Sequence, residues 1–447
     1  MLTIVGASER ATARIVDRLS LRNPQWTERA MMRLSLVGID ERLSFAREYP
    51  HSTVVPRGAI KIVRQVLMEC DEAFEVVDKR VTGTDIDVSA VSVITPRDYQ
   101  QEAINEIVRR TQGTVILPCG TGKTKLAVLA ILAIKKSTLV IVPTKEIMSQ
   151  WTDDVRNVLG YEAGNVGDGK RDFEPITIAI LNSLDTLESY DELEQFGVIL
   201  HDECHRSCAR TNQRVLSFAP AKYRIGLTAT RIREDRLELL IDWTFGDVIF
   251  QRDVREMVAK KWLMMPELVS VKTNFEFTYN GPDEKRLEAL SQAIMAYAPR
   301  VNMIRDVVVD QHANPKRSIL ILANRKEYCH KIKDALEAAG LDPLVVTGDT
   351  PKKPRKKAIE SMKNGSRRIL IATSLADEGM DIQRLSDVIL AYPESAKART
   401  IQRIGRVMRP VEGKYPMLFD IVDPLVPTLV NRWNERKRTY KSLGLIY

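Results

Sequence analysis

Three kinds of feature are scarce or missing in this sequence of 447 residues. Only five residues are cysteine, and they are scattered along the chain, which excludes a disulfide-stapled scaffold. The longest apolar runs, such as 126–134, reach about half of the roughly 20 residues that a membrane-spanning helix needs. The first ten residues lack the basic-then-apolar order of a secretory signal peptide. We therefore expect a protein of a reducing cytoplasm that has no membrane span.

The composition and the charge indicate a globular protein with one basic half. Apolar residues make up 44% and charged residues 28% of the chain, a balance that disordered and fibrous chains do not show. The net charge is +8, and residues 265–447 carry 31 Lys and Arg against 22 Asp and Glu, whereas residues 1–90 carry 13 of each. A basic half fits either a polyanionic partner such as nucleic acid or a merely solvated surface.

The order of apolar runs predicts an α/β fold. From about residue 92 onwards, short β-branched runs alternate with longer helical stretches, which is typical of parallel sheets with helices on both faces. The alternation comes in two series, so we expect two tandem α/β domains with parallel sheets. The first 90 residues lack it and predict a small α+β domain. The expected organisation is an N-terminal domain over 1–90, an α/β domain over 91–258, a connecting segment over 259–300 and a second α/β domain over 301–447.

A glycine-rich segment with the letters LPCGTGKT follows a predicted strand and opens a predicted helix. Phosphate-cradling loops lie at such junctions, because backbone N–H groups at a helix N-terminus attract anions. Gly120 and Gly122 let these groups turn toward the phosphates, although a leucine stands where a strict P-loop has its first glycine. Lys123 supplies a positive charge at the β- and γ-phosphates, and the Thr124 hydroxyl can ligate Mg²⁺. The predicted ATP site comprises Pro118, Cys119, Gly120, Thr121, Gly122, Lys123 and Thr124.

Two adjacent carboxylates end the apolar run VILH. Asp202 is the candidate that holds Mg²⁺, and Glu203 is the candidate base that orients and activates the attacking water. The competing interpretation is a zinc site, since histidine and cysteine recur in the same stretch. That site would consist of His201, Cys204, His205 and Cys208.

With these two motifs the chain resembles the superfamily-two DExH helicases and translocases over about residues 96–410. The resemblance implies two tandem RecA-like domains and the cofactors ATP and Mg²⁺. The letters PRDYQ are similar to the family's adenine-recognition element, which implies that Gln100 binds the adenine edge with Arg97 nearby. The letters ATSLADEGMDI resemble a segment of the second domain in which Gly379 and Asp381 face the ribose and the phosphates.

Further motifs resemble the family's nucleic-acid track. They are IVPTKEI, LNSL, GLTAT and the start of ATSLADEGMDI. Three letters that begin at Arg233, just after GLTAT, resemble the RED element of XPB-type DNA helicases, which implies a role in gripping or separating the duplex. The contacts implied are Pro143, Thr144, Lys145, Asn182, Ser183, Thr228, Thr230, Arg233 and Thr373.

The letters QRIGRVMR resemble the family's arginine-finger element. The resemblance implies that Arg406 and Arg409 point at the γ-phosphate and that Gln402 contacts the attacking water. Positive charge that arrives only when two domains close would stabilise the phosphoryl-transfer transition state and tie hydrolysis to domain movement. The catalytic residues implied are therefore Glu203, Gln402, Arg406 and Arg409.

A small domain ahead of the motor resembles the layout of XPB-type helicases and of the bacteriophage branch-migrating helicase UvsW. The resemblance implies an ATP-dependent DNA helicase or translocase, 3′ to 5′ in polarity, that unwinds or branch-migrates forked and junction DNA in replication, recombination or repair. The implied setting is the cytoplasm of a bacterial or phage-infected cell, with replication or recombination proteins as candidate partners. The alternatives are an RNA-directed DExH ATPase and a nucleic-acid-binding scaffold without active ATPase.

The C-terminal letters NRWNERKRTYKSLG predict a strongly basic helix that also carries two aromatic residues. It has two interpretations. Either it packs Trp433 and Tyr440 on the second α/β domain, or Arg432, Arg436 and Lys437 contact phosphates.

Overall fold

The computed structural model describes residues 1–447 except 92–93, 207–209, 232–236, 374–381, 395–403 and 447, and it leaves the side chains of residues 206 and 210–213 undescribed. The chain divides into two compact units, residues 1–117 with 122–251 and residues 118–121 with 252–447. No helix in the described part of the chain is both long and apolar enough to span a bilayer. The residues of the sequence analysis that lie outside the described ones are Cys208, Arg233, Gly379, Asp381 and Gln402.

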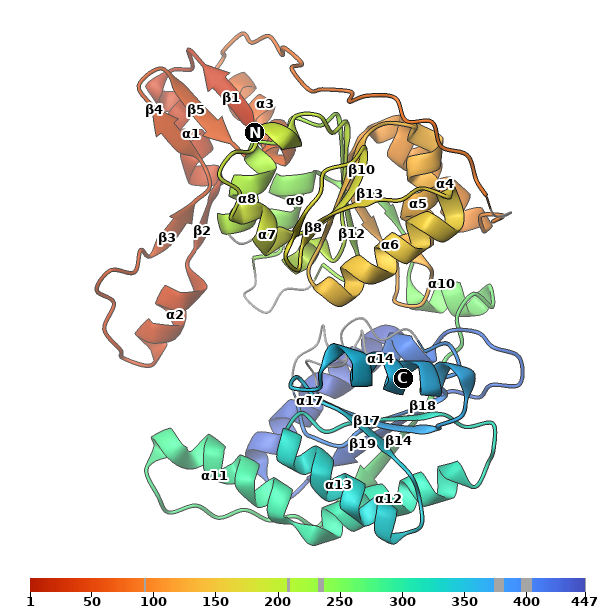
Figure 1. The fold of residues 1–447 in the computed structure, drawn as a ribbon. Coiled ribbons are helices and arrows are strands. Elements are labelled where there is room, and N and C mark those ends of the chain that lie inside the picture. Colours follow the sequence, from red (N-terminus) through yellow and green to blue (C-terminus); the bar gives the residue numbers. More distant parts are fainter. Residues whose placement is uncertain (92–93, 207–209, 232–236, 374–381, 395–403, 447) are drawn as a thin grey trace. The chain divides into compact units, whose positions relative to one another are not determined.

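The first unit begins with a small three-stranded antiparallel sheet in the order β1 (Leu2–Val5), β5 (Ser52–Val55) and β4 (Arg47–Tyr49). Its helices are α1 (Glu9–Arg18) and α3 (Ile60–Glu69). The Ser8 side chain caps α1 by accepting a hydrogen bond from the N–H of Ala11 at 3.2 Å. An arm drawn in red in Figure 1 carries α2 (Pro24–Met31) between the paired strands β2 (Ser20–Arg22) and β3 (Arg42–Ser44).

The main sheet of the first unit has eight strands, and all neighbouring strands are parallel except the last pair. The central strand is buried at every position, which explains why its sequence TLVIV is continuously apolar instead of alternating. The strand order is β13 (Val248–Gln251), β6 (Gln112–Ile116), β12 (Tyr223–Thr228), β11 (Val198–His201), β7 (Thr138–Val142), β10 (Ile176–Ile180), β8 (Gly164–Gly167), β9 (Lys170–Arg171). The helices are α4 (Asp98–Arg110), α5 (Lys123–Ile134), α6 (Lys145–Leu159), α7 (Leu181–Asp185), α8 (Arg210–Ser217) and α9 (Leu239–Phe245).

One apolar core runs through the first unit and includes side chains from residues 4–67 and from residues 139–245. The buried Arg57 guanidinium donates to the carbonyl of Ala221 at 2.6 Å, and a Cβ on Gly58 would lie 2.1 Å from the carbonyl oxygen of Asp242. The N-terminal elements therefore pack tightly against α9 and the residues just before β12, and only glycine fits at residue 58.

The second unit is built on a six-stranded sheet whose neighbouring strands are all parallel. Its order is β14 (Glu267–Lys272), β19 (Met417–Val422), β18 (Asp387–Leu390), β15 (Ile319–Leu322), β17 (Ile369–Ala372), β16 (Leu344–Val346). The described helices are α10 (Val254–Ala259), α11 (Asp283–Ala296), α12 (Ala298–His312), α13 (Lys326–Ala338), α14 (Lys352–Asn364) and α17 (Pro427–Leu443). The two large sheets confirm the predicted α/β fold with two RecA-like domains.

The edge strand β14 was not predicted from the sequence. It lies inside the range 259–300 that the sequence analysis describes as a connecting segment, and it pairs with β19 from Glu267 opposite Met417 to Lys272 opposite Val422. Its sequence ELVSVK places charged residues at both ends, as is common on sheet edges, and it lacks the continuous apolar run of the central strands. The division into domains of 1–90, 91–258, 259–300 and 301–447 stays a prediction.

Candidate nucleotide and nucleic-acid site

The described candidate residues of the first unit follow the carboxyl ends of neighbouring parallel strands. The glycine-rich loop follows β6, Asp202 follows β11, Pro143 follows β7, Asn182 follows β10 and Thr228 ends β12. Carboxyl ends of parallel strands meet at one edge of the sheet, where ligands bind in open α/β folds. The sheet order therefore brings together motifs that lie more than a hundred residues apart in sequence.

The glycine-rich loop closes on itself before α5 begins. Gly120 and Gly122 have φ angles of 84° and 79°, in the left-handed region that glycine adopts without strain. The Lys123 ammonium donates to the carbonyl of Leu117 at 3.2 Å, and the Thr121 hydroxyl donates to the carbonyl of Pro118 at 2.8 Å. Gly122 is the N-cap of α5 and has no side chain to bind the first-turn N–H groups. The loop thus presents backbone donors at a helix N-terminus, as anion sites do.

Gln100 lies beside this loop at the start of α4. Its Oε1 accepts from the N–H of Arg97 at 3.0 Å, and its Nε2 donates to the carbonyl of Gly122 at 3.4 Å. Arg97 is the N-cap of α4, so one side chain joins the helix cap to the glycine-rich loop.

Asp202 is a buried carboxylate held by two donors. Its Oδ2 accepts from the indole N–H of Trp151 at 2.9 Å, and its Oδ1 accepts from the N–H of Glu203 at 2.9 Å. Burial, followed by the charge of Glu203, raises the pKa of the Asp202 carboxyl to about 6, whereas Lys123 lowers it. The role of Trp151 was not predicted from the sequence, because a tryptophan inside a helix carries no local sign of a partner 51 residues away.

Glu203 has a φ of 48°, in a region that non-glycine residues rarely adopt. Such strain persists where the surroundings impose it, and it clusters at functional sites. The Glu203 carboxylate lies 3.3 Å from Nδ1 of His205. That same Nδ1 lies 2.9 Å from Oγ1 of Thr228, which in turn donates to the carbonyl of Thr230 at 2.7 Å. One chain of contacts therefore joins the candidate base to the loop after β12.

The described side chains of the alternative zinc site have other surroundings. His201 is buried against Phe245, and burial lowers the pKa of its imidazole to about 4. Cys204 packs against β12, so a Cβ on Gly226 would lie 2.8 Å from the Cys204 sulfur. Among the described residues, no group of three or more His, Cys, Asp or Glu could hold a metal ion.

The predicted strand-contacting residues differ in exposure. Lys145 and Asn182 are exposed, whereas Pro143, Thr144 and Ser183 are half-buried. The Thr144 hydroxyl accepts from the N–H of Ile147 at 3.4 Å as the N-cap of α6. Thr228, Thr230 and Thr373 are buried.

In the second unit, Arg406 and Arg409 line one small pocket together with Leu320, Ile382 and Leu385. Both arginines are half-buried. The pocket therefore places the two candidate fingers beside Ile382, the residue that follows Asp381 in the chain.

Two families match the two large sheets. Residues 93–233 match the family described as "Type III restriction enzyme, res subunit", and residues 299–411 match the "Helicase conserved C-terminal domain". The "DNA 3'-5' translocase XPB2" of Sulfurisphaera tokodaii is 25% identical over 73% of this chain and 81% of its own length. The "Probable helicase D10" of Escherichia phage T5 is 28% identical over 84% of this chain and 82% of its own length.

Solved structures share the fold. The ATP-dependent Type ISP restriction-modification enzyme LlaBIII bound to DNA has a TM-score of 0.57 at 15% identity, covering 78% of this chain and 30% of that chain. Dbp5 of S. cerevisiae bound to RNA and ADP BeF3 has a TM-score of 0.55 at 15% identity, covering 79% of this chain and 89% of that chain.

The matched families and the paired RecA-like sheets define an ATP-hydrolysing helicase. More narrowly, the chain resembles the superfamily-two helicases, in particular XPB-type and phage helicases. This confirms the resemblance and the enzyme class expected from LPCGTGKT and HDECH. The roles of individual site residues stay predictions.

Proposed function

We propose that this chain is an ATP-driven DNA helicase or translocase that moves 3′ to 5′ and acts on forked or junction DNA in replication, recombination or repair. The observation that carries the proposal is the row of nucleotide and strand-contact candidates along the carboxyl ends of one parallel sheet. The relative named a DNA 3'-5' translocase supports DNA as the track.

In the proposed site, the loop 117–124 cradles the phosphates of ATP, Lys123 neutralises the β- and γ-phosphates, and Gln100 lies at the adenine side. Glu203 accepts the proton of the attacking water. Arg406 and Arg409 bring positive charge to the γ-phosphate, where it stabilises the transition state more than the ground state.

The donor set fits Mg²⁺. This ion prefers oxygen ligands and usually keeps several waters, and Thr124 and Asp202 offer a hydroxyl and a carboxylate beside the loop. Burial and the charge of Glu203 raise the pKa of Asp202, and a bound cation beside it would oppose that shift. Bound Mg²⁺ would supply charge neutralisation at the phosphates.

The DNA track would depend on phosphate contacts, since a motor that steps along any sequence cannot rely on base edges. Among the candidates, the exposed Lys145 and Asn182 are placed to touch the strand, whereas the buried Thr228 and Thr230 would couple the track to the nucleotide site. We further propose that residues 1–90 influence the choice of DNA structure.

The test is ATP hydrolysis by the wild type and by Lys123→Ala at one fixed salt concentration, titrated with single-stranded DNA, duplex, a fork, a four-way junction and single-stranded RNA. Stimulation strongest with branched DNA and lost in the variant is the expected result. Equal stimulation by all DNA forms would reject branched DNA as the preferred substrate.

An RNA-directed ATPase is the second candidate, since the RNA-bound Dbp5 structure shares the fold over most of both chains. Stimulation by RNA far above that by any DNA would favour it. No stimulation by any nucleic acid would contradict both candidates and favour the scaffold.

A further inference from the structure

Each of the four residues after β18, 391–394, is bound by a side chain from elsewhere in the second unit. The carbonyl of Ala391 accepts from Nε and Nη2 of Arg300 at 3.3 and 3.1 Å. The Tyr392 hydroxyl donates to Oγ of Ser291 at 2.8 Å. The first two positions are thus bound by α12 and α11.

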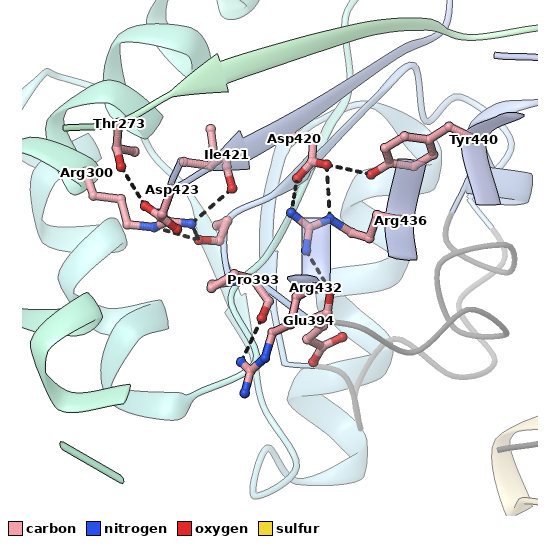
Figure 2. Close-up of polar contacts among 11 residues, drawn as sticks. Thr273, Arg300, Pro393, Glu394, Asp420, Ile421, Asp423, Arg432, Arg436 and Tyr440 are labelled. Carbon is pink, nitrogen blue, oxygen red and sulfur yellow. Dashed lines mark hydrogen bonds and ion pairs between the residues drawn. The ribbon is translucent and has the colours of Figure 1, made fainter. Parts of the chain in front are cut away.

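The next two positions are bound by the C-terminal helix α17. Arg432 donates through Nη1 to the carbonyl of Pro393 at 3.1 Å, and Arg436 donates through Nη1 to the carbonyl of Glu394 at 2.7 Å. Figure 2 shows both arginines reaching from α17 to the same short piece of backbone. The basic face of α17 therefore binds the protein's own carbonyls.

Two aspartates of β19 and its end compensate the buried arginines (Figure 2). Arg436, which is 3% exposed, makes bonds of 3.0 and 2.9 Å to the two carboxylate oxygens of Asp420. Arg300 likewise forms a buried ion pair with Asp423. Paired guanidiniums keep further N–H groups available in a fixed fork, so each arginine can bind a carbonyl without burying a net charge.

The backbone at Arg409, the second candidate finger, is bound by a buried lysine. The Lys414 ammonium is buried and donates to the carbonyl of Arg409 at 2.8 Å and to the carbonyl of Gln383 at 3.4 Å. The N–H of Met264, which precedes β14, donates to the carbonyl of Met408 at 2.7 Å. One ammonium thus ties a candidate finger to the residue two positions after Asp381.

We propose that Lys414, which donates to the carbonyl of Arg409 itself, is a positioning residue that fixes this candidate finger. The inference rests on the proposed function, because it assumes that Arg409 acts on the γ-phosphate. Small displacements of charged groups at a reacting centre cost large factors in rate, so the backbone anchor acts on turnover and not on substrate binding.

These contacts also separate the two interpretations of the C-terminal helix. Arg436 and Tyr440 are buried on Asp420, with the Tyr440 hydroxyl 2.8 Å from a carboxylate oxygen, and Lys437 lies over the Trp433 ring at 4.0 Å from its centroid. The described contacts favour packing on the second α/β domain. A phosphate-contacting helix would instead need these cations to face solvent.

The experiment compares Lys414→Met with a matched control, Lys363→Met at an exposed position of α14, in the full chain. For each protein we would measure kcat and KM for ATP with saturating DNA, the Kd for the same DNA at two salt concentrations, and Tm. The test variant should lose about tenfold in kcat, with KM, Kd and Tm close to wild type, and the control should lose nothing. Lys414→Arg, which keeps a charged donor, should retain more of the kcat than Lys414→Met.

Normal kcat in Lys414→Met, with Arg406→Ala and Arg409→Ala inactive, would overturn the positioning role and leave the helicase proposal standing. Weaker DNA binding with a changed salt slope in Lys414→Met would overturn it in favour of a phosphate contact. If Lys414→Met does not fold, a fall of kcat between pH 7.5 and 9 that is identical in the wild type and in Lys414→Arg would reject the positioning role. A wild type without ATPase would reject both proposals.

Discussion

Nδ1 of His205 lies 2.9 Å from Oγ1 of Thr228, and the same nitrogen is 3.3 Å from the carboxylate of Glu203. The contact joins the short 3-10 helix that follows β11 to the end of the neighbouring strand β12, between residues 23 positions apart in the chain. In the proposed site, a change at the nucleotide would therefore reach the loop after β12 through a single imidazole. Buried networks of this kind act as units, because each member polarises and orients the next.

His205 and Thr228 should accordingly be coupled in function. We expect His205→Ala and Thr228→Val each to lower DNA-stimulated kcat by about tenfold, and the double variant to be little worse than either single one, because both remove the same connection. A double-mutant cycle on ATP turnover measures this. Losses that multiply would show that the two residues act independently.

Glu203→Gln should keep ATP binding and lose turnover, because the amide preserves the shape but cannot take a proton. General-base catalysis contributes typically 10²–10⁴-fold, so we expect kcat to fall by at least about a hundredfold. Fluorescent-nucleotide binding and single-turnover hydrolysis separate the two steps, with Lys123→Ala as the comparison that loses nucleotide affinity. Near-normal turnover would remove Glu203 as the base.

Asp202→Asn should stabilise the metal-free and nucleotide-free protein while abolishing activity. The folded pKa of about 6 lies above the ordinary value of 3.8, so the folded state binds more protons and loses stability as pH rises through this window. Above pH 6 the full penalty is present, at most about 3 kcal/mol for two pKa units. Thermal unfolding in EDTA should show a higher Tm for the variant at pH 7.5 and a smaller difference at pH 5. An equal difference at both pH values would contradict the shift.

Removing one partner of the buried ion pair between Arg300 and Asp423 should lower the free energy of unfolding, because the other charge stays buried without a partner. Both side chains are fully buried, so Arg300→Met leaves a carboxylate without its cation and should destabilise the protein by about 3–5 kcal/mol. The double variant Arg300→Met with Asp423→Leu removes both charges and should recover at least half of that loss. Chemical denaturation of the three proteins tests this, and a double variant as unstable as the single one would refute the charge explanation.

The kcat for ATP hydrolysis should fall at alkaline pH because Lys414 loses its proton there. Burial, together with the nearby Arg409, lowers the pKa of its ammonium to about 8, and Asp387 opposes this. Above pH 8 the neutral amine binds the two carbonyls more weakly, so kcat should fall between pH 7.5 and 9. Lys414→Arg keeps its charge and should lack that fall. An identical fall in both proteins would assign it to another group.

Local sequence determined the elements and the chemistry of the motifs. Runs such as TLVIV and VILH are β-branched and apolar throughout, so they form buried parallel strands wherever they lie. LPCGTGKT contains in eight consecutive residues the glycines and the lysine that a phosphate loop needs, because that loop is built from contiguous backbone. The N-terminal part, 1–90, also differs in sequence, because it lacks the alternation of apolar strand-like runs and helical stretches.

Only the tertiary structure decided which motifs touch and which charges face inward. Trp151 reaches Asp202 across 51 residues, Arg436 reaches the carbonyl of Glu394 across 42, and β14 joins its sheet beside a strand some 150 positions later. Nothing local encodes such contacts, since they depend on the order of strands in a sheet and on the packing of a helix against it. The basic helix α17 shows this most directly, because its arginines could equally have met phosphates until Asp420 and the backbone after β18 were seen to bind them.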